Sequence, residues 1–221
     1  EIAVFPEYGA MELAAAFGEA ISTDVAASLA AVSGALQAMD DVHADLARRH
    51  RLHILAASGP SAREGDRFVN AARLVAPSGR IGVIEKIIMT PFERDWGVSG
   101  GGPVAVFETM LGRVGIAICY DSEFPLLVRA MTEAGAELIL VPSCTERLSG
   151  ANRIRTAALA RALENTCACI TSPIVGEARW SPATDINTGT AGVFVPAEGG
   201  LSDTGVLAEG TLNEPGWVTA D

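Results

Sequence analysis

Glu7, Lys86 and Cys119 each come at or just after the end of an apolar run of the kind that forms a buried strand. Loops at strand ends expose reactive groups while a rigid scaffold holds them in place. A carboxylate can act as a general base and a thiolate as a nucleophile. An ammonium that points inward needs a carboxylate partner, because an isolated buried charge is costly. These three positions are therefore the first candidates for functional residues.

The segment around Cys119 has the order of elements found at a nucleophile elbow. The run 113–118 predicts a strand that leads into Cys119, and a helix follows within a few residues. In such a turn the side chain projects, and the backbone N–H of Tyr120 can face an oxyanion. The alternative is a buried structural cysteine, the usual fate of a free thiol. We expect that fate for Cys167 and Cys169, which lie within a predicted strand.

Lys86 is the only lysine among 16 basic residues. An ammonium is a compact point charge and a guanidinium is a wide planar fork, so this bias hints that arginine would not work at position 86. Strand alternation places Ile84 and Lys86 on one face, with Val83 and Glu85 on the other. A surface lysine kept by chance is the alternative, and for Glu7 the alternative is an exposed glutamate at a strand end.

The wider pattern supplies the elements that must position these residues. Turn residues at 77–79 and 110–112 predict two hairpins, and strand–helix–strand units follow them. This mixture predicts an α/β protein with mixed sheets covered by helices. We expect strands at 2–5, 52–57, 68–76, 80–85, 104–109, 113–118, 137–141, 167–171, 191–195, 205–212 and 217–220, helices at 11–21, from a cap at 22–24 to about 49, at 125–134 and at 154–165, and a loop at 97–103.

Composition narrows the class of protein. The chain has 221 residues, of which 49% are hydrophobic and 19% charged, and this favours a thick core over disorder. A net charge of −11 disfavours nucleic acid and anionic membranes as partners. No uninterrupted apolar run reaches the length of a membrane span. The four cysteines have no C-x-x-C spacing, so we expect neither a disulfide scaffold nor a metal site, and without a signal peptide we expect a cytoplasmic protein.

Several motifs occur in a fixed order along the chain. They are FPE at 5–7, the strand ending at Lys86 with TPFE at 90–93, and GRVGIAICYDSEFP at 112–125. Further support comes from AELILVPS at 136–143, RALEN at 161–165 and NEPGW at 213–217. A single motif such as FPE is weak, but the ordered set resembles the carbon–nitrogen hydrolase (nitrilase) superfamily over essentially the whole chain.

The resemblance implies an α/β fold, a four-layer αββα sandwich with two mixed sheets, commonly dimerised and with no cofactor. It implies a single domain over residues 1–221, without the family's first strand and helix and without its C-terminal tail. It also implies a Glu–Lys–Cys triad at Glu7, Lys86 and Cys119, with an accessory glutamate at Glu93. The Tyr120 N–H is the expected oxyanion donor. We expect Phe124, Cys144 and Thr145 to line the substrate pocket.

The implied activity is hydrolysis of a non-peptide C–N bond in a small amide or carbamoyl compound. Glu7 would take the thiol proton as Cys119 attacks the carbonyl carbon, and a thioester would remain after ammonia or an amine leaves. Lys86 and the Tyr120 N–H would stabilise the oxyanion. The alternatives are nitrile hydrolysis by the same triad, and a catalytically degenerate member that serves as a binding or assembly module. We expect a homodimer or higher homo-oligomer.

Other side chains suggest weaker hypotheses. Arg147, Arg153 and Arg155 are candidates for gripping a substrate carboxylate, although solvated arginines are the simpler interpretation for at least two of them. A Cys–His hydrolase would need a histidine near Cys119, and nothing in the sequence ties His43, His50 or His53 to it. A metal hydrolase lacks the clustered His and carboxylate spacing that such sites need.

Overall fold

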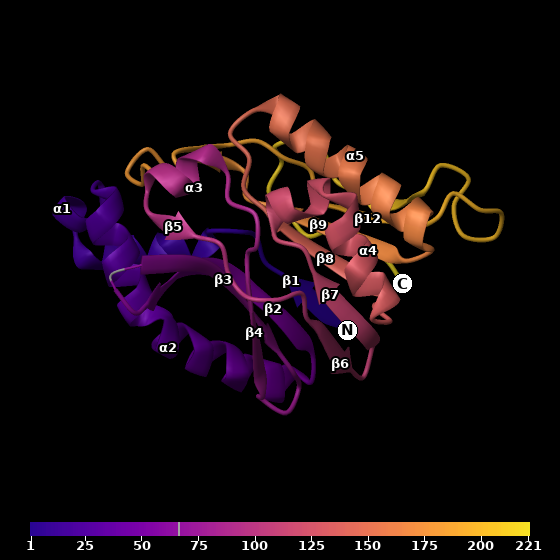
Figure 1. The fold of residues 1–221 in the computed structure, drawn as a ribbon, viewed down its shortest axis with the longest axis horizontal. Helices are drawn as coiled ribbons and strands as arrows, with labels where there is room; N and C mark the ends of the chain where they lie inside the picture. The colour runs from indigo at the N-terminus through magenta and orange to yellow at the C-terminus, as the bar shows by residue number, and fades with distance from the viewer. Residues whose placement is uncertain (66) are drawn as a thin grey trace. The chain divides into compact units, whose positions relative to one another are not determined.

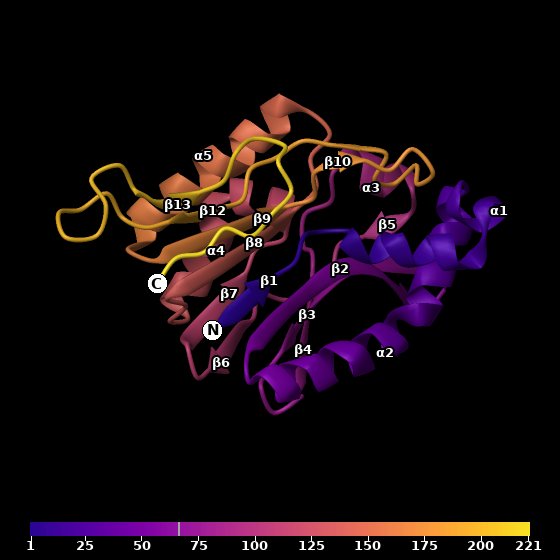
Figure 2. The ribbon, with the colours of Figure 1, turned by 180° about the vertical axis from the view of Figure 1, so that it is seen from behind.

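A computed structural model describes residues 1–65 and 67–221 of the chain. The Cα positions divide it into two compact units. Unit 1 comprises Glu1–Pro103 and Glu177–Ile186, and unit 2 comprises Val104–Gly176 and Asn187–Asp221. Each unit contains a mixed sheet with helices beside it (Figures 1 and 2).

The sheet of unit 1 has the strand order β1-β2-β3-β4, and β5 also pairs with β3. The pairs β1–β2 and β3–β5 are parallel, whereas β2–β3 and β3–β4 are antiparallel. The sheet therefore mixes the two kinds of pairing, and the predicted hairpin around 77–79 is confirmed. The strands are β1 (Ile2–Val4), β2 (His53–Arg63), β3 (Arg67–Val75), β4 (Ile81–Glu85) and β5 (Val98–Ser99).

Unit 1 also contains η1 (Gly9–Phe17), α1 (Glu19–Ser22), α2 (Val25–His50) and α3 (Pro91–Asp95). The predicted cap is confirmed, because the Asp24 side chain accepts a hydrogen bond from Ala27 N at 2.7 Å. Helix α2 runs along the sheet and buries alanines against Ile54, Ala56 and Val75 (Figure 1). The single helix expected at 11–21 is wrong, since Gly18 takes a φ of 87° and separates a 3₁₀ helix from one α-helical turn.

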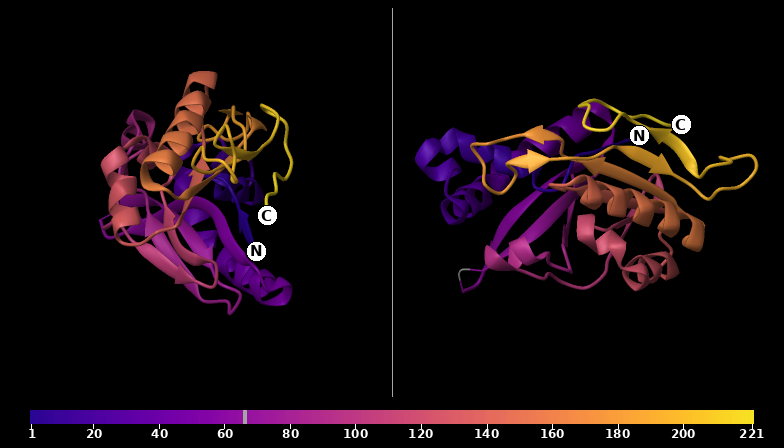
Figure 3. Two further views of the ribbon diagram at one scale, coloured as in Figure 1. Left: turned by 90° about the vertical axis from the view of Figure 1, so that its right-hand side faces the viewer. Right: turned by 90° about the horizontal axis from the view of Figure 1, so that it is seen from above.

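The sheet of unit 2 has the strand order β13-β12-β9-β8-β7-β6. Its centre, β7–β8–β9, is parallel, and the flanking pairs are antiparallel. Helices α4 and α5 lie beside these strands (Figure 3, right). The elements are β6 (Val106–Thr109), β7 (Gly112–Ile116), η2 (Cys119–Glu123), α4 (Pro125–Glu133), β8 (Leu138–Ser143), α5 (Leu148–Asn165), β9 (Ala168–Pro173), β12 (Gly192–Phe194) and β13 (Val206–Glu209).

The expected α/β class with two mixed sheets is confirmed, and so is the second hairpin, β6–β7. Several boundaries were predicted wrongly. β2 continues through 58–60, β8 includes Pro142, and α5 begins at Leu148 rather than at Ile154. The expected loop at 97–103 contains β5, and residues 217–220 form no strand. The short pair β10 (Gly176–Glu177) and β11 (Ile186–Asn187) was not predicted. No helix in the described ranges is long and apolar enough to cross a membrane.

Candidate active site

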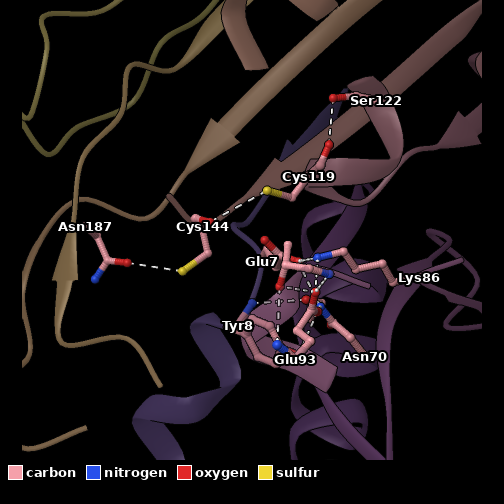
Figure 4. A network of polar contacts seen from close by, with 11 residues as sticks. Glu7, Tyr8, Asn70, Lys86, Glu93, Cys119, Ser122, Cys144 and Asn187 are labelled. Carbon is pink, nitrogen blue, oxygen red and sulfur yellow. Dashed lines mark hydrogen bonds and ion pairs between the residues drawn. The ribbon is translucent and has the colours of Figure 1, made fainter. Parts of the chain in front are cut away.

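Lys86 in unit 1 is buried between two carboxylates. Its Nζ donates hydrogen bonds to Glu7 Oε1 and to Glu93 Oε2, each at 2.7 Å (Figure 4). All three residues are at most 2% exposed. The predicted alternation along β4 is confirmed, because Ile84 is buried on the Lys86 face and Val83 is exposed on the other. The inward ammonium therefore has the carboxylate partners that its burial requires.

The backbone brings Glu7 and Lys86 to this place from separate strands. Glu7 lies just beyond β1, where the backbone stays tied to β2 by Ser58 N donating to Pro6 O at 3.1 Å. Lys86 lies just beyond β4, where its own N donates to Asn70 O at 2.8 Å. Both residues thus extend past the end of a strand while the sheet still fixes their backbones, as expected for groups that need rigid placement.

Glu93 is fixed by the start of helix α3. Thr90 is the N-cap, and Thr90 and Glu93 form a capping box. Glu93 Oε2 accepts hydrogen bonds from Thr90 N and Thr90 Oγ1, both at 2.9 Å, in addition to the one from Lys86. Burial tends to raise the pKa of the Glu93 carboxyl, but the Lys86 ammonium and hydrogen bonds from Lys86 and Thr90 outweigh it and leave this pKa below its ordinary value.

Tyr8 directs its hydroxyl into the cluster formed by Glu7, Lys86 and Glu93. Its φ of 54° is left-handed, which is uncommon for a residue other than glycine. Its OH donates to Glu93 Oε1 at 2.9 Å, and its backbone N donates to Ser58 Oγ at 3.0 Å. Asn70, in the middle of β3, donates from Nδ2 to Glu7 Oε1 at 2.9 Å and to Glu93 Oε1 at 3.2 Å (Figure 4). Neutral donors therefore supplement the single ammonium around two carboxylates.

Cys119 in unit 2 has the backbone of an elbow. It follows β7, opens η2 and has a φ of 47°, in the left-handed region where a non-glycine residue is strained by about 1–3 kcal/mol. Ser122 Oγ donates to Cys119 O at 2.7 Å, and Arg161 Nε donates to Ser122 O at 3.1 Å. Cys119 is 4% exposed, and all four cysteines are free thiols. The hydrogen bonds of Ser122 and Arg161 thus support a backbone conformation that residues other than glycine rarely adopt.

The end of β8 lies beside this thiol within unit 2. Cys119 Sγ is 3.7 Å from Cys144 O, and Cys144 Sγ donates to Asn187 Oδ1 at 3.1 Å (Figure 4). Thr145 is joined to Thr188 in both directions, by its Oγ1 donating to Thr188 O at 2.5 Å and its O accepting from Thr188 N at 2.7 Å. Of the predicted pocket residues, Cys144 therefore lies beside Cys119, and Thr145, the next residue, is held in place by Thr188.

Other predicted residues have different surroundings. The Tyr120 and Phe124 rings pack edge to face at 5.0 Å. Cys167 and Cys169 are buried, as predicted. The three arginines sit beside carboxylates of the chain itself: Arg153 beside Glu123, Arg155 beside Glu209 and Arg147, 82% exposed at its side chain, beside Glu146. His43 and His50 belong to α2 and His53 begins β2, all in unit 1. The described ranges contain no group of three or more His, Cys, Asp or Glu residues suited to a metal ion.

Sequence reasoning missed Tyr8, Asn70, Thr90 and Asn187. Two of them carry a readable signal. Thr90 and Glu93 have the T-x-x-E spacing of a capping box, and Asn70 is a residue type that strands disfavour within an otherwise apolar run. Tyr8 and Asn187 have no local signal, because their partners lie 85 and 43 positions away in the sequence.

Comparison with known proteins gives consistent matches. A family model described as carbon-nitrogen hydrolase matches residues 1–192. The chain is 36% identical over 170 residues to a probable hydrolase of Bacillus subtilis, which covers 76% of this chain and 33% of that protein. It is 37% identical over 76 residues to a deaminated glutathione amidase of Yersinia enterocolitica, covering 34% of this chain and 27% of that protein. The chain thus spans about a third or less of the length of these relatives.

Solved structures with the same fold are also found. An amidase from Nesterenkonia sp. AN1 matches with a TM-score of 0.72 at 22% identity, covering 100% of this chain and 79% of the other. At this level of identity the match establishes a shared fold.

Proposed function

The chain belongs to the carbon–nitrogen hydrolase family, and from that membership we propose that it hydrolyses a non-peptide C–N bond of a small amide or carbamoyl compound. The observation that carries the proposal is the burial of Lys86 at 2.7 Å from both Glu7 and Glu93. A buried ammonium with two carboxylates is expensive to assemble for stability alone, since an apolar replacement is often at least as stable. It is well suited to stabilise an oxyanion beside a general base.

We assign the nucleophile to Cys119 and the proton transfers to Glu7. The Cys119 thiol gives its proton to Glu7 as sulfur bonds to the carbonyl carbon, and the carbonyl oxygen becomes an oxyanion. Lys86 and the Tyr120 N–H stabilise that oxygen, and loss of one such donor typically costs about 2.7–4 kcal/mol of barrier. The C–N bond then breaks as Glu7 returns the proton to nitrogen, which releases ammonia or an amine. Water, deprotonated by Glu7, hydrolyses the thioester and restores the thiol.

The hydrogen bonds around Glu93 make it poorly suited to act as the base. Glu93 accepts from Lys86, Thr90, Tyr8 and Asn70, and a carboxylate held by several donors is a weak base. Glu93 is therefore assigned to holding Lys86 in place. Cys144 and Thr145, beside the thiol at the end of β8, and Phe124 are proposed to contact the acyl part of the substrate.

A screen for ammonia release tests the function directly. Small amides, carbamoyl amino acids and nitriles are incubated with the protein, with Cys119→Ala as the blank and Cys167→Ala as the matched control. We expect release from at least one amide or carbamoyl compound, none with Cys119→Ala and normal release with Cys167→Ala. Release from nitriles alone would favour the nitrilase alternative, and equal release with Cys119→Ala would contradict the proposal.

Selective alkylation separates an active enzyme from a degenerate binding module. By exposure alone, half-buried Cys144 should react with iodoacetamide before Cys119, Cys167 and Cys169, which are all buried. An activated thiol at Cys119 should reverse that order, because the thiolate is the reactive form. Peptide mass spectrometry after brief labelling measures the order, and labelling in urea shows that all four sites are detectable. Preferential labelling of Cys144 would favour the degenerate module.

We also propose that the protein forms a homodimer or a higher homo-oligomer, as the resemblance implies. Light scattering during size-exclusion chromatography measures the mass, and a monomer at micromolar concentration would contradict this.

A further inference from the structure

Asn70 bonds to every charged member of the cluster around Lys86. Its Nδ2 donates to Glu7 Oε1 at 2.9 Å and to Glu93 Oε1 at 3.2 Å, and its backbone O accepts from Lys86 N at 2.8 Å. Its side chain is fully buried within β3 (Figure 4). A single amide NH₂ group therefore bridges two carboxylates that belong to different elements, and each of its hydrogens goes to a different one.

The orientation of this amide is dictated by the carboxylates. Asn70 Oδ1 has no hydrogen-bond partner among the described residues, although the atom is buried. An unsatisfied buried acceptor is unfavourable, so stability of the strand does not explain an asparagine here. Turning the amide over would place Oδ1 against two carboxylate oxygens, which repel it. The amide is thus oriented for donation to Glu7 and Glu93, and this orientation leaves its own oxygen without a hydrogen bond from the described residues.

Charge balance shows what this donation achieves. Glu7 and Glu93 both accept a hydrogen bond from Lys86 Nζ, so two carboxylates share this ammonium. Like charges that share a buried site tend to force a proton onto one of them. Tyr8 donates to Glu93, whereas Asn70 donates to both carboxylates. Hydrogen bonds to the charged form oppose protonation.

We propose that Asn70 is a positioning residue that keeps Glu7 and Glu93 ionised together beside one ammonium, so that Glu7 can accept the thiol proton at neutral pH. The proposal rests on the proposed function and assigns to Asn70 no contact with the substrate. It predicts that removal of the amide makes Glu7 protonate at a higher pH.

The test is the pH dependence of kcat/KM in Asn70→Ala. We expect its acid limb to move to higher pH by about one unit, so that kcat/KM at a given pH on that limb falls by about tenfold, with KM little changed. The matched control is Asn165→Ala on α5, where the lost amide bonds to Arg161 O, and its acid limb should stay in place. A residue with a merely structural role would lower the amount of folded enzyme without moving the limb.

A second variant and a stability measurement test the role of Asn70 even if Asn70→Ala does not fold or no substrate is found. If Asn70→Ala does not fold, Asn70→Asp gives a side chain of the same size that cannot donate when ionised, and it should shift the limb in the same direction. Urea unfolding of wild type and variant across acidic pH gives a readout without substrate. The amide stabilises the ionised carboxylates, so the stability advantage of wild type over the variant should be largest near neutral pH and shrink as pH falls. Absence of activity in the wild type would remove the proposed function alone. An unmoved acid limb together with a stability advantage that does not change with pH would overturn the role of Asn70.

Discussion

Lys86 holds its ammonium 2.7 Å from each of two carboxylates, and its whole side chain is buried with it. A lysine suits this place because its charge is compact and its stem is flexible, whereas a guanidinium is a wide planar fork. The sequence offered a hint of this choice by keeping one lysine among 16 basic residues. The geometry around position 86 therefore calls for a lysine.

Lys86→Arg should therefore leave a folded but nearly inactive protein. The guanidinium overfills a site closed around an ammonium, and we expect kcat/KM to fall by on the order of a hundredfold or more, as for a lost oxyanion donor. Circular dichroism checks the fold and steady-state kinetics measure the loss. Arg63→Lys is the control, because Arg63 pairs with Glu85 at a more exposed site. Near-normal turnover of Lys86→Arg would contradict the role of the lysine.

The grouping of Glu7, Lys86 and Glu93 could be predicted from the sequence, because the motifs that carry them follow apolar runs and resemble one family. Asn70 could not be predicted in the same way. A lone asparagine in an apolar run has no charge to balance until the fold brings two carboxylates to it. The sequence therefore revealed the charged residues, and the neutral donors that set their ionisation appeared only in three dimensions.

At the scale of elements, α3 is a short helix whose first turn aims Glu93 at Lys86. Its capping box uses Thr90 both to satisfy the helix N-terminus and to donate to the Glu93 carboxylate. Helix α2 has an ordinary N-cap, since the exposed Asp24 accepts from Ala27 N and has no bond to the cluster. The Thr90 and Asp24 N-caps can therefore be compared, because only the Thr90 cap bonds to a residue of the cluster.

Thr90→Ala and Asp24→Ala should each lower the free energy of unfolding by about 1 kcal/mol, which is typical for loss of an N-cap side chain. Only Thr90→Ala should also lower kcat, because it frees the carboxylate that holds Lys86. Urea unfolding and amide hydrolysis measured on the same samples distinguish the two effects. Equal kcat values for the two variants would show that the cap has no part in the site.

The strand boundaries show why local rules failed. The strand predicted at 52–57 ends before Gly59 and Pro60, which are turn-forming residues. β2 nevertheless continues through them with a register shift between Ala56 and Gly59, and a side chain at position 59 would strike Ala10. Pro142 lies within β8, and the register with β7 ends at Leu140, so the missing N–H does not interrupt that ladder. In both strands the tertiary neighbours, which the sequence does not display locally, override the turn-forming residues.

At the scale of the whole molecule, the charged cluster belongs to unit 1 and Cys119 to unit 2. The proposed reaction needs groups from both units. The mixed sheets and their hairpins followed from periodicity and turn residues, but the contact between Glu7 and Lys86, 79 positions apart in sequence, is a property of the fold of unit 1. The family resemblance predicted that Glu7 and Lys86 would meet, and the approach of Cys119 to them stays a prediction.

Acid unfolding tests the cluster through the stability of the whole protein. The pKa of Glu93 is lowered in the folded state, so its contribution is present above its ordinary value of 4.5 and is lost as pH falls toward the lowered pKa. The stability advantage of wild type over Glu93→Gln should therefore be largest near neutral pH and shrink below about pH 4.5. Glu133→Gln, at an exposed ion pair, is the control. An advantage that stays constant from neutral to acidic pH would contradict this assignment.

The central claim is that Glu7, Lys86 and Cys119 act on one carbonyl group. A crystal structure of the protein alkylated at Cys119 with iodoacetamide measures this directly, because the adduct carries a carbonyl oxygen. We predict that Lys86 Nζ lies about 3 Å from that oxygen or from the sulfur, with the Glu7 carboxylate within hydrogen-bond reach of the adduct. An adduct that extends away from Lys86 and Glu7, with neither group able to reach it, would contradict the account.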